Sequence, residues 1–316
     1  MTMSMIICKP SQPFLQIRNS CKSSRPPSKD KVVVVLGATG TGKSRLSINL
    51  ATRFHGEVVN ADKIQVYEGL DVITNKITDE ESCGVPHHLL GIMHPAADFT
   101  STDFCDSASS AVASVVERRR VPIIAGGSNS YIEALIDSEM HGFQSKYDCC
   151  YLWLDVSMPV LHEVISERVD MMVDKGMVEE ARQYFNPNGD YSKGIRRAIG
   201  VPEFDYYFRV EALADEETRT RLLQKAVYDV KINSCRLACC QLEKILRLRN
   251  DKGWNIYRLD ATDALQKNAK ESSRKAWKEL VLEPSMKIVN KFLTTPGPNI
   301  YTNKVPTLTA MAASIR

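Results

Sequence analysis

The segment that most constrains the fold lies at residues 37–44, where Gly-Ala-Thr-Gly-Thr-Gly-Lys-Ser matches G-x-x-x-x-G-K-[ST] in full. The preceding run, Val32–Leu36, is apolar and rich in valine, which predicts a strand buried on both faces. Residues 45–54 predict a helix, with Leu46 and Leu50 one turn apart. A strand, a glycine-rich loop and a helix in this order predict a phosphate-binding loop.

The chemistry of this loop explains its composition. Glycine lets backbone N–H groups converge on phosphate oxygens, and the helix N-terminus adds free donors. Lysine contributes a point charge, and serine a hydroxyl for Mg²⁺, which takes the rest of its shell from water and phosphate. We therefore expect Mg²⁺ as cofactor, with Ser44 as its protein ligand. The residues predicted to bind phosphate are Gly37, Ala38, Thr39, Gly40, Thr41, Gly42, Lys43 and Ser44.

Strand and helix patterns alternate along the first half of the chain. Strands are predicted at 57–60, 121–125 and 150–155, and helices at 101–118 and 129–136. This alternation predicts an α/β fold with a parallel sheet and right-handed crossovers. We expect a P-loop NTPase-like parallel sheet flanked by helices, with a small helical subdomain.

The 316 residues divide into five predicted segments. They are a disordered leader or transit peptide (1–30), the P-loop α/β core (31–155), a mainly helical subdomain (156–215), a long helix and return to the core (216–283), and a loose tail (284–316). The leader has no acid before Asp30, five basic residues and six serines, which is typical of an organelle transit peptide and equally of a disordered tail. A plastid location is the expectation, with the cytoplasm as alternative.

Composition excludes several classes of protein. A net charge of +3 does not indicate a general nucleic-acid binder. No apolar run approaches the roughly 18–20 residues of a membrane span, so no membrane is expected. The nine cysteines contain no Cys-x-x-Cys, which argues against a zinc finger.

Asp62 directly follows the predicted strand at 57–60. Carboxyl ends of parallel strands share one edge of the sheet, so Asp62 can face the phosphate site. Three roles remain open from its position alone: a magnesium ligand, a general base, or a surface acid. Gly126–Gly127 follows another predicted strand at the same edge. These glycines either allow the backbone to approach a ligand closely or simply form the turn from the strand to the next helix.

Several further blocks make the chain resemble the isopentenyltransferase family. They are Gly37–Ser44, Asn60–Asp71 (with Asp-x-x-Gln-Val-Tyr), Thr74–Lys76, Pro86–Leu89 and Ala125–Ser128. That family includes bacterial tRNA dimethylallyltransferases and adenylate isopentenyltransferases of cytokinin synthesis. Lys63, the Thr-Asn-Lys run and Gly194–Gly200 resemble the plant adenylate branch.

The resemblance implies a prenyltransferase. Dimethylallyl diphosphate would bind the phosphate loop, and a free adenine nucleotide (AMP, ADP or ATP, undecided) would be the acceptor. Asp62 would hydrogen-bond the exocyclic amine of adenine and act as general base, with Lys43 stabilising the leaving diphosphate. Further substrate-binding residues are predicted at Gln65, Gly127, Ser128, Arg197, Lys231 and Arg236.

Two rival functions remain. A P-loop small-molecule kinase would place ATP on the same loop and release ADP. A tRNA dimethylallyltransferase carries a larger inserted domain for the anticodon stem, so the short segment after Asp155 and the missing finger favour a free nucleotide and no tRNA. We expect a monomer.

Overall fold

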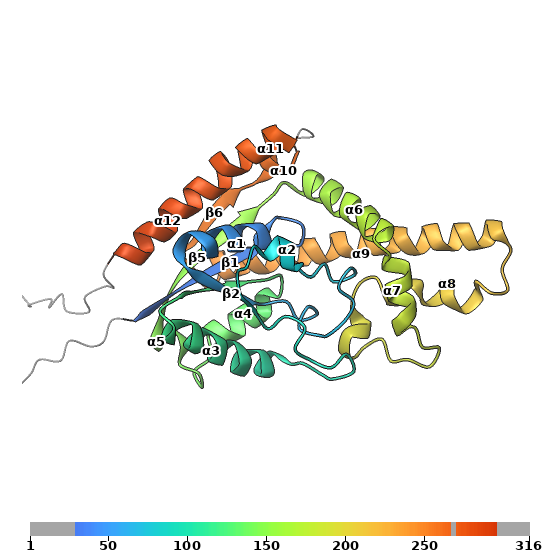
Figure 1. Cartoon of the computed structure of the whole chain (residues 1–316), viewed down its shortest axis with the longest axis horizontal. Helices are drawn as coiled ribbons and strands as arrows, with labels where there is room; N and C mark the ends of the chain where they lie inside the picture. Colours follow the sequence, from blue (N-terminus) through green and yellow to red (C-terminus); the bar gives the residue numbers. More distant parts are fainter. Residues whose placement is uncertain (1–28, 267–269, 296–316) are drawn as a thin grey trace, which may run out of the picture.

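The structure is a computed structural model that describes residues 29–266 and 270–295. Its centre is a six-stranded sheet in the order β3-β2-β4-β1-β5-β6, and every neighbouring pair of strands is parallel. The strands are β1 (Asp30–Gly37), β2 (Gly56–Asn60), β3 (His87–His88), β4 (Val121–Ala125), β5 (Tyr147–Asp155) and β6 (Ile256–Asp260). The predicted fold class is confirmed (Figure 1).

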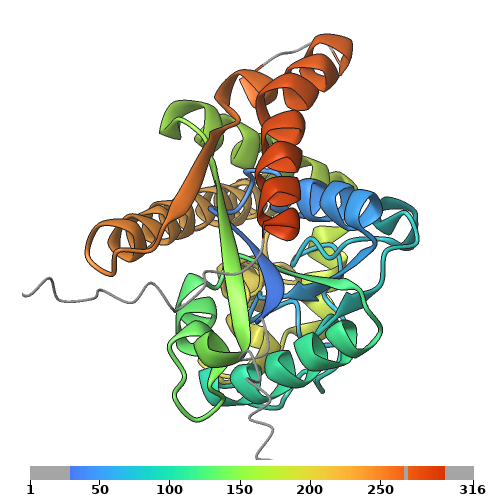
Figure 2. The ribbon, with the colours of Figure 1, turned by 90° about the vertical axis from the view of Figure 1, so that its left-hand side faces the viewer.

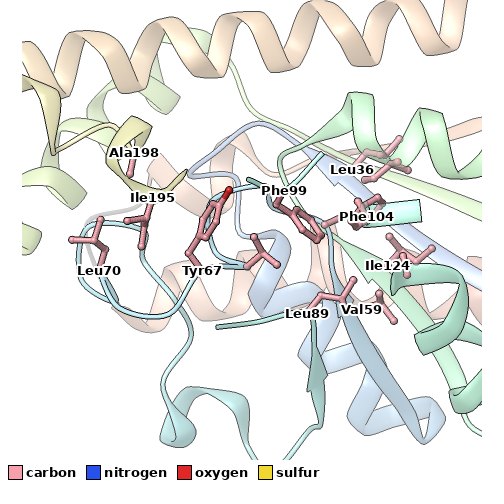
Figure 3. Close-up of a cluster of buried hydrophobic side chains, with 14 of the residues drawn as sticks. Leu36, Val59, Tyr67, Leu70, Leu89, Phe99, Phe104, Ile124, Ile195 and Ala198 are labelled. Atoms are coloured by element: carbon pink, nitrogen blue, oxygen red, sulfur yellow. The ribbon is translucent and has the colours of Figure 1, made fainter. Parts of the chain in front are cut away.

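The first strand is buried on both faces, as predicted. Val32, Val34 and Leu36 point into one hydrophobic core, and Val33 and Val35 into the other. This alternation follows from the two-residue period of a strand, and a strand covered on both sides has no need of polar side chains. Figure 3 shows the first core, where Leu36 and Ile124 lie near Phe104.

Helices cover both faces of the sheet (Figures 1 and 2). The first core is closed by helices α3, α4 and α9, and the second by α1, the first half of α6 and the C-terminal helices. Their bounds are α1 (Lys43–Phe54), α3 (Ser101–Glu117), α4 (Asn129–Ile136), α6 (Met158–Asp174) and α9 (Glu216–Asn250). Short helices α2 (Asp79–Ser82) and α5 (Phe143–Lys146) lie in the connections.

A helical region extends from the carboxyl edge of the sheet. It contains α6, α7 (Met177–Tyr184), two 3₁₀ turns (Gly194–Arg197 and Pro202–Phe204), α8 (Asp205–Val210) and the first half of α9. Figure 1 shows α9 running from the sheet out past α6 and α7 toward α8. Within the described residues, no helix is both long and apolar enough to cross a membrane.

The prediction of a loose chain from residue 284 is wrong for its first part. After α10 (Thr262–Gln266), α11 (Lys270–Trp277) and a π-helical turn (Lys278–Leu282), helix α12 spans Glu283–Thr294. Pro284 occupies its first turn, where proline is compatible with a helix, and Val289 is buried in the second core. The predicted leader up to residue 28, and the tail from residue 296, lie outside the described residues.

Candidate active site

A cavity of about 430 Å³ opens at the carboxyl edge of the sheet, where the loops after β1, β2 and β4 meet. The phosphate loop, the turn after β2 and helices α6 and α9 all contribute to its wall. Its size falls in the usual range of roughly 300–1,000 Å³ for ligand pockets. The polar residues that line it include Thr39, Lys43, Ser44, Asn60, Asp62, Lys63, Gln65, Arg168, Arg197 and Gln241.

The phosphate loop has the shape that its glycines predict. Gly40 and Gly42 have φ values of +87° and +89°, a region that L side chains rarely adopt. A Cβ atom on Gly42 would also lie 2.7 Å from the Trp277 ring of α11. Five of the eight predicted residues, Thr39, Gly40, Gly42, Lys43 and Ser44, line the cavity. Gly37, Ala38 and Thr41 instead form the turn, in which the Thr41 hydroxyl donates to the Ala38 carbonyl (2.8 Å).

The Lys43 ammonium lies at the base of this loop. Its Nζ donates to the Ala38 carbonyl oxygen at 2.7 Å. The pKa of Lys43 is lowered to about 8, mainly by burial and also by the charge of nearby Arg168, while the charge of Asp62 opposes the shift. A cation that is poorly solvated in this way gains more from a bound diphosphate than an exposed lysine would.

Arg168 of α6 was not among the predicted site residues. Its Nη2 donates to the Thr39 hydroxyl at 2.9 Å, while its Nε is buried with no partner among the described residues. Burial lowers its pKa, and the charge of Asp62 opposes that effect. One sequence pattern could have indicated it, because Arg168 is a lone cation on an otherwise apolar helix face. The other residues on that face are Leu161, Ile165 and Met172.

Asp62 lies in the turn that follows β2, opposite the phosphate loop. Its Oδ1 accepts hydrogen bonds from the backbone N–H groups of Ile64 (2.9 Å) and Gln65 (3.4 Å), which fixes the carboxylate. Its Oδ2 accepts no hydrogen bond from the residues described, and a Cβ atom on Gly127 would lie 3.5 Å from it. One carboxylate oxygen is therefore held by the protein and the other is free to accept a proton.

Two predicted substrate contacts belong to the scaffold. The Gln65 amide lines the cavity, but it donates to the carbonyls of Thr74 (2.9 Å) and Asn75 (3.2 Å) and so holds the loop at 74–75. The Ser128 hydroxyl accepts from the Lys63 N–H at 2.9 Å, and Ser128 does not line the cavity. In this structure Ser128 thus positions the turn after Asp62.

The basic residues divide into two groups. Lys63 and Arg197 line the cavity, and Lys244 of α9 is close enough to lower the pKa of Lys63, after burial and Arg197. Lys231 pairs with Asp170 at 2.6 Å, and Arg236 lies on a separate depression beside Asn233. Lys231 and Arg236, both predicted to bind substrate, therefore do not line this cavity. At 100° per residue, both turn away from Val230, Ser234, Leu237 and Gln241, the residues by which α9 lines it.

The remaining wall of the cavity is apolar. Ile73 comes from the loop after Asp62, Met172 and Met177 from α6 and α7, and Val230 and Leu237 from α9. An apolar wall next to a cluster of cations fits a ligand with a hydrocarbon or aromatic part joined to phosphate.

The protein groups suit Mg²⁺ held mainly by its substrate. No group of three or more His, Cys, Asp or Glu side chains is placed to hold a metal ion in the described part of the chain. Mg²⁺ typically keeps waters and takes oxygens from one or two protein groups plus phosphates. The exposed Ser44 hydroxyl at the cavity, beside the loop, fits that limited role.

The fold and the cavity define a P-loop α/β protein whose phosphate loop faces an aspartate and an apolar wall. The family model described as IPP transferase matches residues 65–144 and 137–245. The chain therefore belongs to the IPP transferase family, and the predicted resemblance is confirmed.

Two relatives of this chain are plant proteins. The chain is 56% identical over 267 residues to adenylate isopentenyltransferase 3, chloroplastic, of Arabidopsis thaliana, covering 84% of this chain and 80% of that protein. Adenylate isopentenyltransferase 5, chloroplastic, of the same plant is 54% identical, covering 91% and 90%. A eukaryotic dimethylallyltransferase acting on tRNA shares the fold, with a TM-score of 0.70, 24% identity, and coverage of 87% and 82%.

Proposed function

We propose that this protein transfers the dimethylallyl group of dimethylallyl diphosphate to the exocyclic amine of a free adenine nucleotide. The observation that carries the proposal is the placement of Asp62 and the phosphate loop on opposite sides of one cavity. The plant adenylate isopentenyltransferases, similar over most of their length, support the same reaction. Such a reaction is the first step of cytokinin synthesis.

The phosphate loop is the proposed donor site. The backbone N–H groups at the start of α1, the Lys43 ammonium and the Arg168 guanidinium surround the position of the diphosphate. Negative charge grows on the diphosphate oxygens as the allylic C–O bond breaks, so these donors stabilise the transition state more than the bound donor. Mg²⁺, when bound by the diphosphate and the Ser44 hydroxyl, supplies further charge neutralisation.

The acceptor lies on the other side of the cavity. The Asp62 Oδ2 atom accepts the proton of the adenine amine as the new N–C bond forms, and the diphosphate leaves with the electron pair of the broken C–O bond. Lys63, Arg197 and Lys244 form the cation group proposed to bind the acceptor phosphates. Met172, Met177 and Val230 offer an apolar wall for the prenyl group and the base.

We propose a free nucleotide rather than tRNA as acceptor, and a monomer in solution. The lack of any Cys-x-x-Cys and the similarity to adenylate-modifying relatives support the first point. Both relatives named above are called chloroplastic, which agrees with the predicted plastid location.

One assay tests the reaction. The protein is incubated with dimethylallyl diphosphate, Mg²⁺ and AMP, ADP or ATP in turn, and separately with unmodified tRNA, and the products are weighed by mass spectrometry. A prenylated nucleotide with intact phosphates, together with free diphosphate, is expected. Formation of ADP from ATP without prenylation would identify a kinase instead, and prenylated tRNA alone would identify the tRNA branch.

A further inference from the structure

We infer that Gln241 is a positioning residue that sets the distance between the donor half and the acceptor half of the active site. This inference rests on the proposed function, because it assigns a role within the same cavity. Gln241 lies on α9, far along the chain from both loops, and its side chain is buried. Buried amides are rarely tolerated without hydrogen-bond partners, so its contacts indicate what it is for.

The Gln241 amide bridges the two loops. Its Oε1 accepts from the Thr39 N–H at 2.8 Å, and its Nε2 donates to the Gly127 carbonyl at 2.9 Å. Thr39 belongs to the phosphate loop after β1, and Gly127 to the turn after the neighbouring strand β4. A single side chain therefore ties together the two loops beyond the point where the pairing of β1 and β4 ends.

The turn at Gly127 is in turn fixed to Asp62. The Ala61 N–H donates to the Ala125 carbonyl at 2.8 Å, and the Ser128 N–H donates to the Ala61 carbonyl at 3.0 Å. A Cβ atom on Gly126 would lie 2.1 Å from the Ala61 carbonyl oxygen, so these backbones are in direct contact. The path from Thr39 through Gln241 to Asp62 thus consists of short contacts between buried or half-buried groups.

The helix itself is anchored at this point. The Asn129 amide donates to the Gln241 backbone carbonyl at 3.1 Å, which holds α9 against the start of α4. The bridge is therefore supported by the backbone as well as by the side chain. We infer that it holds the donor C–O bond in line with the acceptor amine, a geometry in which a 1 Å error costs on the order of 10²-fold in rate.

The test separates positioning from binding. In Gln241→Met, which keeps the length and removes both hydrogen bonds, kcat should fall by about 10–100-fold. The dissociation constants of dimethylallyl diphosphate and of the nucleotide, each measured alone by calorimetry, should change by less than about threefold because each half-site keeps its own charged groups. Gln224→Met makes the same change at an exposed position of the same helix and should leave kcat and both constants unchanged.

A second pair of variants guards against a folding defect. Gln241→Glu keeps an acceptor for the Thr39 N–H but loses the donor to Gly127, and should give an intermediate loss of kcat. Gly127→Ala should displace the Gln241 amide by a steric clash, because the new Cβ would lie 2.4 Å from Nε2. If both act on one bridge, Gly127→Ala combined with Gln241→Met should be little worse than the worse single variant.

The outcomes are distinct from those for the proposed function. A wild-type protein that makes no prenylated nucleotide contradicts the function, whereas an active wild type with a folded Gln241→Met of near-normal kcat contradicts the bridge. A loss of donor affinity equal to the loss of rate would also overturn it, because Gln241 would then be part of the donor site. Additive losses in the double variant would show that the two residues act separately.

Discussion

At the scale of single residues, the cavity joins groups of opposite charge from distant parts of the chain. Lys43 and Arg168 face Asp62, and the negative charge of Asp62 favours the protonated form of both cations. Their burial has the opposite effect and is the larger one. A bound diphosphate would relieve this imbalance, which is why the site is electrostatically prepared for an anion.

Asp62→Asn tests the general base. It keeps the size of the side chain but removes most of its basicity, so kcat should fall by about 10²–10⁴-fold. Donor affinity should change little, because Lys43 and the loop backbone remain. Calorimetric titration of Mg²⁺–dimethylallyl diphosphate into the variant checks this. A collapse of donor binding together with turnover would instead make Asp62 a ligand of the metal.

Arg168→Gln tests the cation that the sequence did not single out. It removes a charged donor from beside Thr39, so KM for dimethylallyl diphosphate should rise about tenfold or more, in line with the value of a charge-assisted hydrogen bond. Steady-state kinetics with varied donor measure it. Arg236→Gln is the matched control and should leave KM unchanged, because Arg236 lies on a different depression. Equal effects of the two variants would contradict this assignment.

At the scale of elements, the loop between β2 and β3 is held from both sides. The Glu180 carboxylate of α7 accepts from the N–H groups of Val72 (3.0 Å) and Ile73 (2.7 Å), and Gln65 holds the carbonyls of Thr74 and Asn75. Ile73, Thr74 and Asn75 line the cavity. The helical region thus shapes the cavity through a surface loop rather than by direct packing alone.

Glu180→Ala should loosen this loop. Both N–H groups would lose their acceptor, and we expect KM for the nucleotide to rise several-fold while KM for the donor changes less, since the phosphate loop is not involved. Initial rates with each substrate varied measure the two constants. Glu179→Ala, one residue away and exposed, is the control. A larger rise in KM for the donor than for the nucleotide would contradict the assignment of this loop to the acceptor side of the cavity.

The β2–β3 side of the sheet contains a second polar cluster, whose residues do not line the cavity. The buried Glu57 carboxylate of β2 pairs with Arg118 (2.6 Å) and with His88 of β3 (2.7 Å). The hydrogen bond from Arg118, and secondarily that from His88, lowers the pKa of Glu57. Because the pKa is lower in the folded state, the ionised carboxylate stabilises the folded protein at pH values above its unfolded-state pKa of about 4.3. That stabilisation is lost as pH falls through the folded-state pKa.

Glu57→Gln should therefore lower the free energy of unfolding at pH 7 by about 1–3 kcal/mol, the range for hydrogen bonds to charged groups. The difference from wild type should shrink as pH falls below about 4.3 and through the lowered folded-state pKa, because the wild-type carboxylate then becomes protonated in the folded state as well. Urea unfolding at several pH values checks the sign. A difference that grows on acidification would contradict the assigned pKa direction.

At the scale of the whole molecule, the C-terminal helices complete the phosphate loop. The buried Trp277 ring of α11 packs against Gly42, and the Arg45 guanidinium lies 4.3 Å from the ring centre. Figure 2 shows α11 and α12 above the sheet beside α1, the helix that begins at the loop. A segment more than 200 residues downstream is thus part of the support for the donor site.

Trp277→Ala should cost about 3–5 kcal/mol of stability, as for other large-to-small changes in a core, and should also weaken donor binding because the loop loses its backing. Denaturant unfolding and donor titration measure the two effects. Trp254→Ala removes a tryptophan whose ring packs against Tyr151 (4.6 Å between ring centroids) and does not line the cavity, so it should lower stability without a selective loss of donor affinity. Equal donor affinities in the two variants would contradict the role of Trp277.

The predicted plastid location also belongs to the whole molecule. Fusing residues 1–30 to a fluorescent reporter should direct it to plastids in plant cells, because an acid-poor, serine-rich leader is typical of transit peptides. A reporter of the same length with Arg18, Lys22 and Arg25 changed to Glu is the control and should stay in the cytosol. A wild-type leader that leaves the reporter in the cytosol would contradict the location.

Local sequence patterns are enough to predict the sheet, the phosphate loop and the position of Asp62 at the sheet edge. These depend on local patterns: apolar runs give buried strands, glycines allow the loop, and the carboxyl ends of parallel strands must share an edge. The structure decided the rest. Arg168 and Gln241 reach the cavity, and Lys244 comes close to Lys63, only because of how α6 and α9 cross the edge of the sheet. Helical periodicity shows which face of α9 is apolar, but not which of its polar residues the packing brings into the cavity, so Lys231 and Arg236 were predicted in place of Gln241.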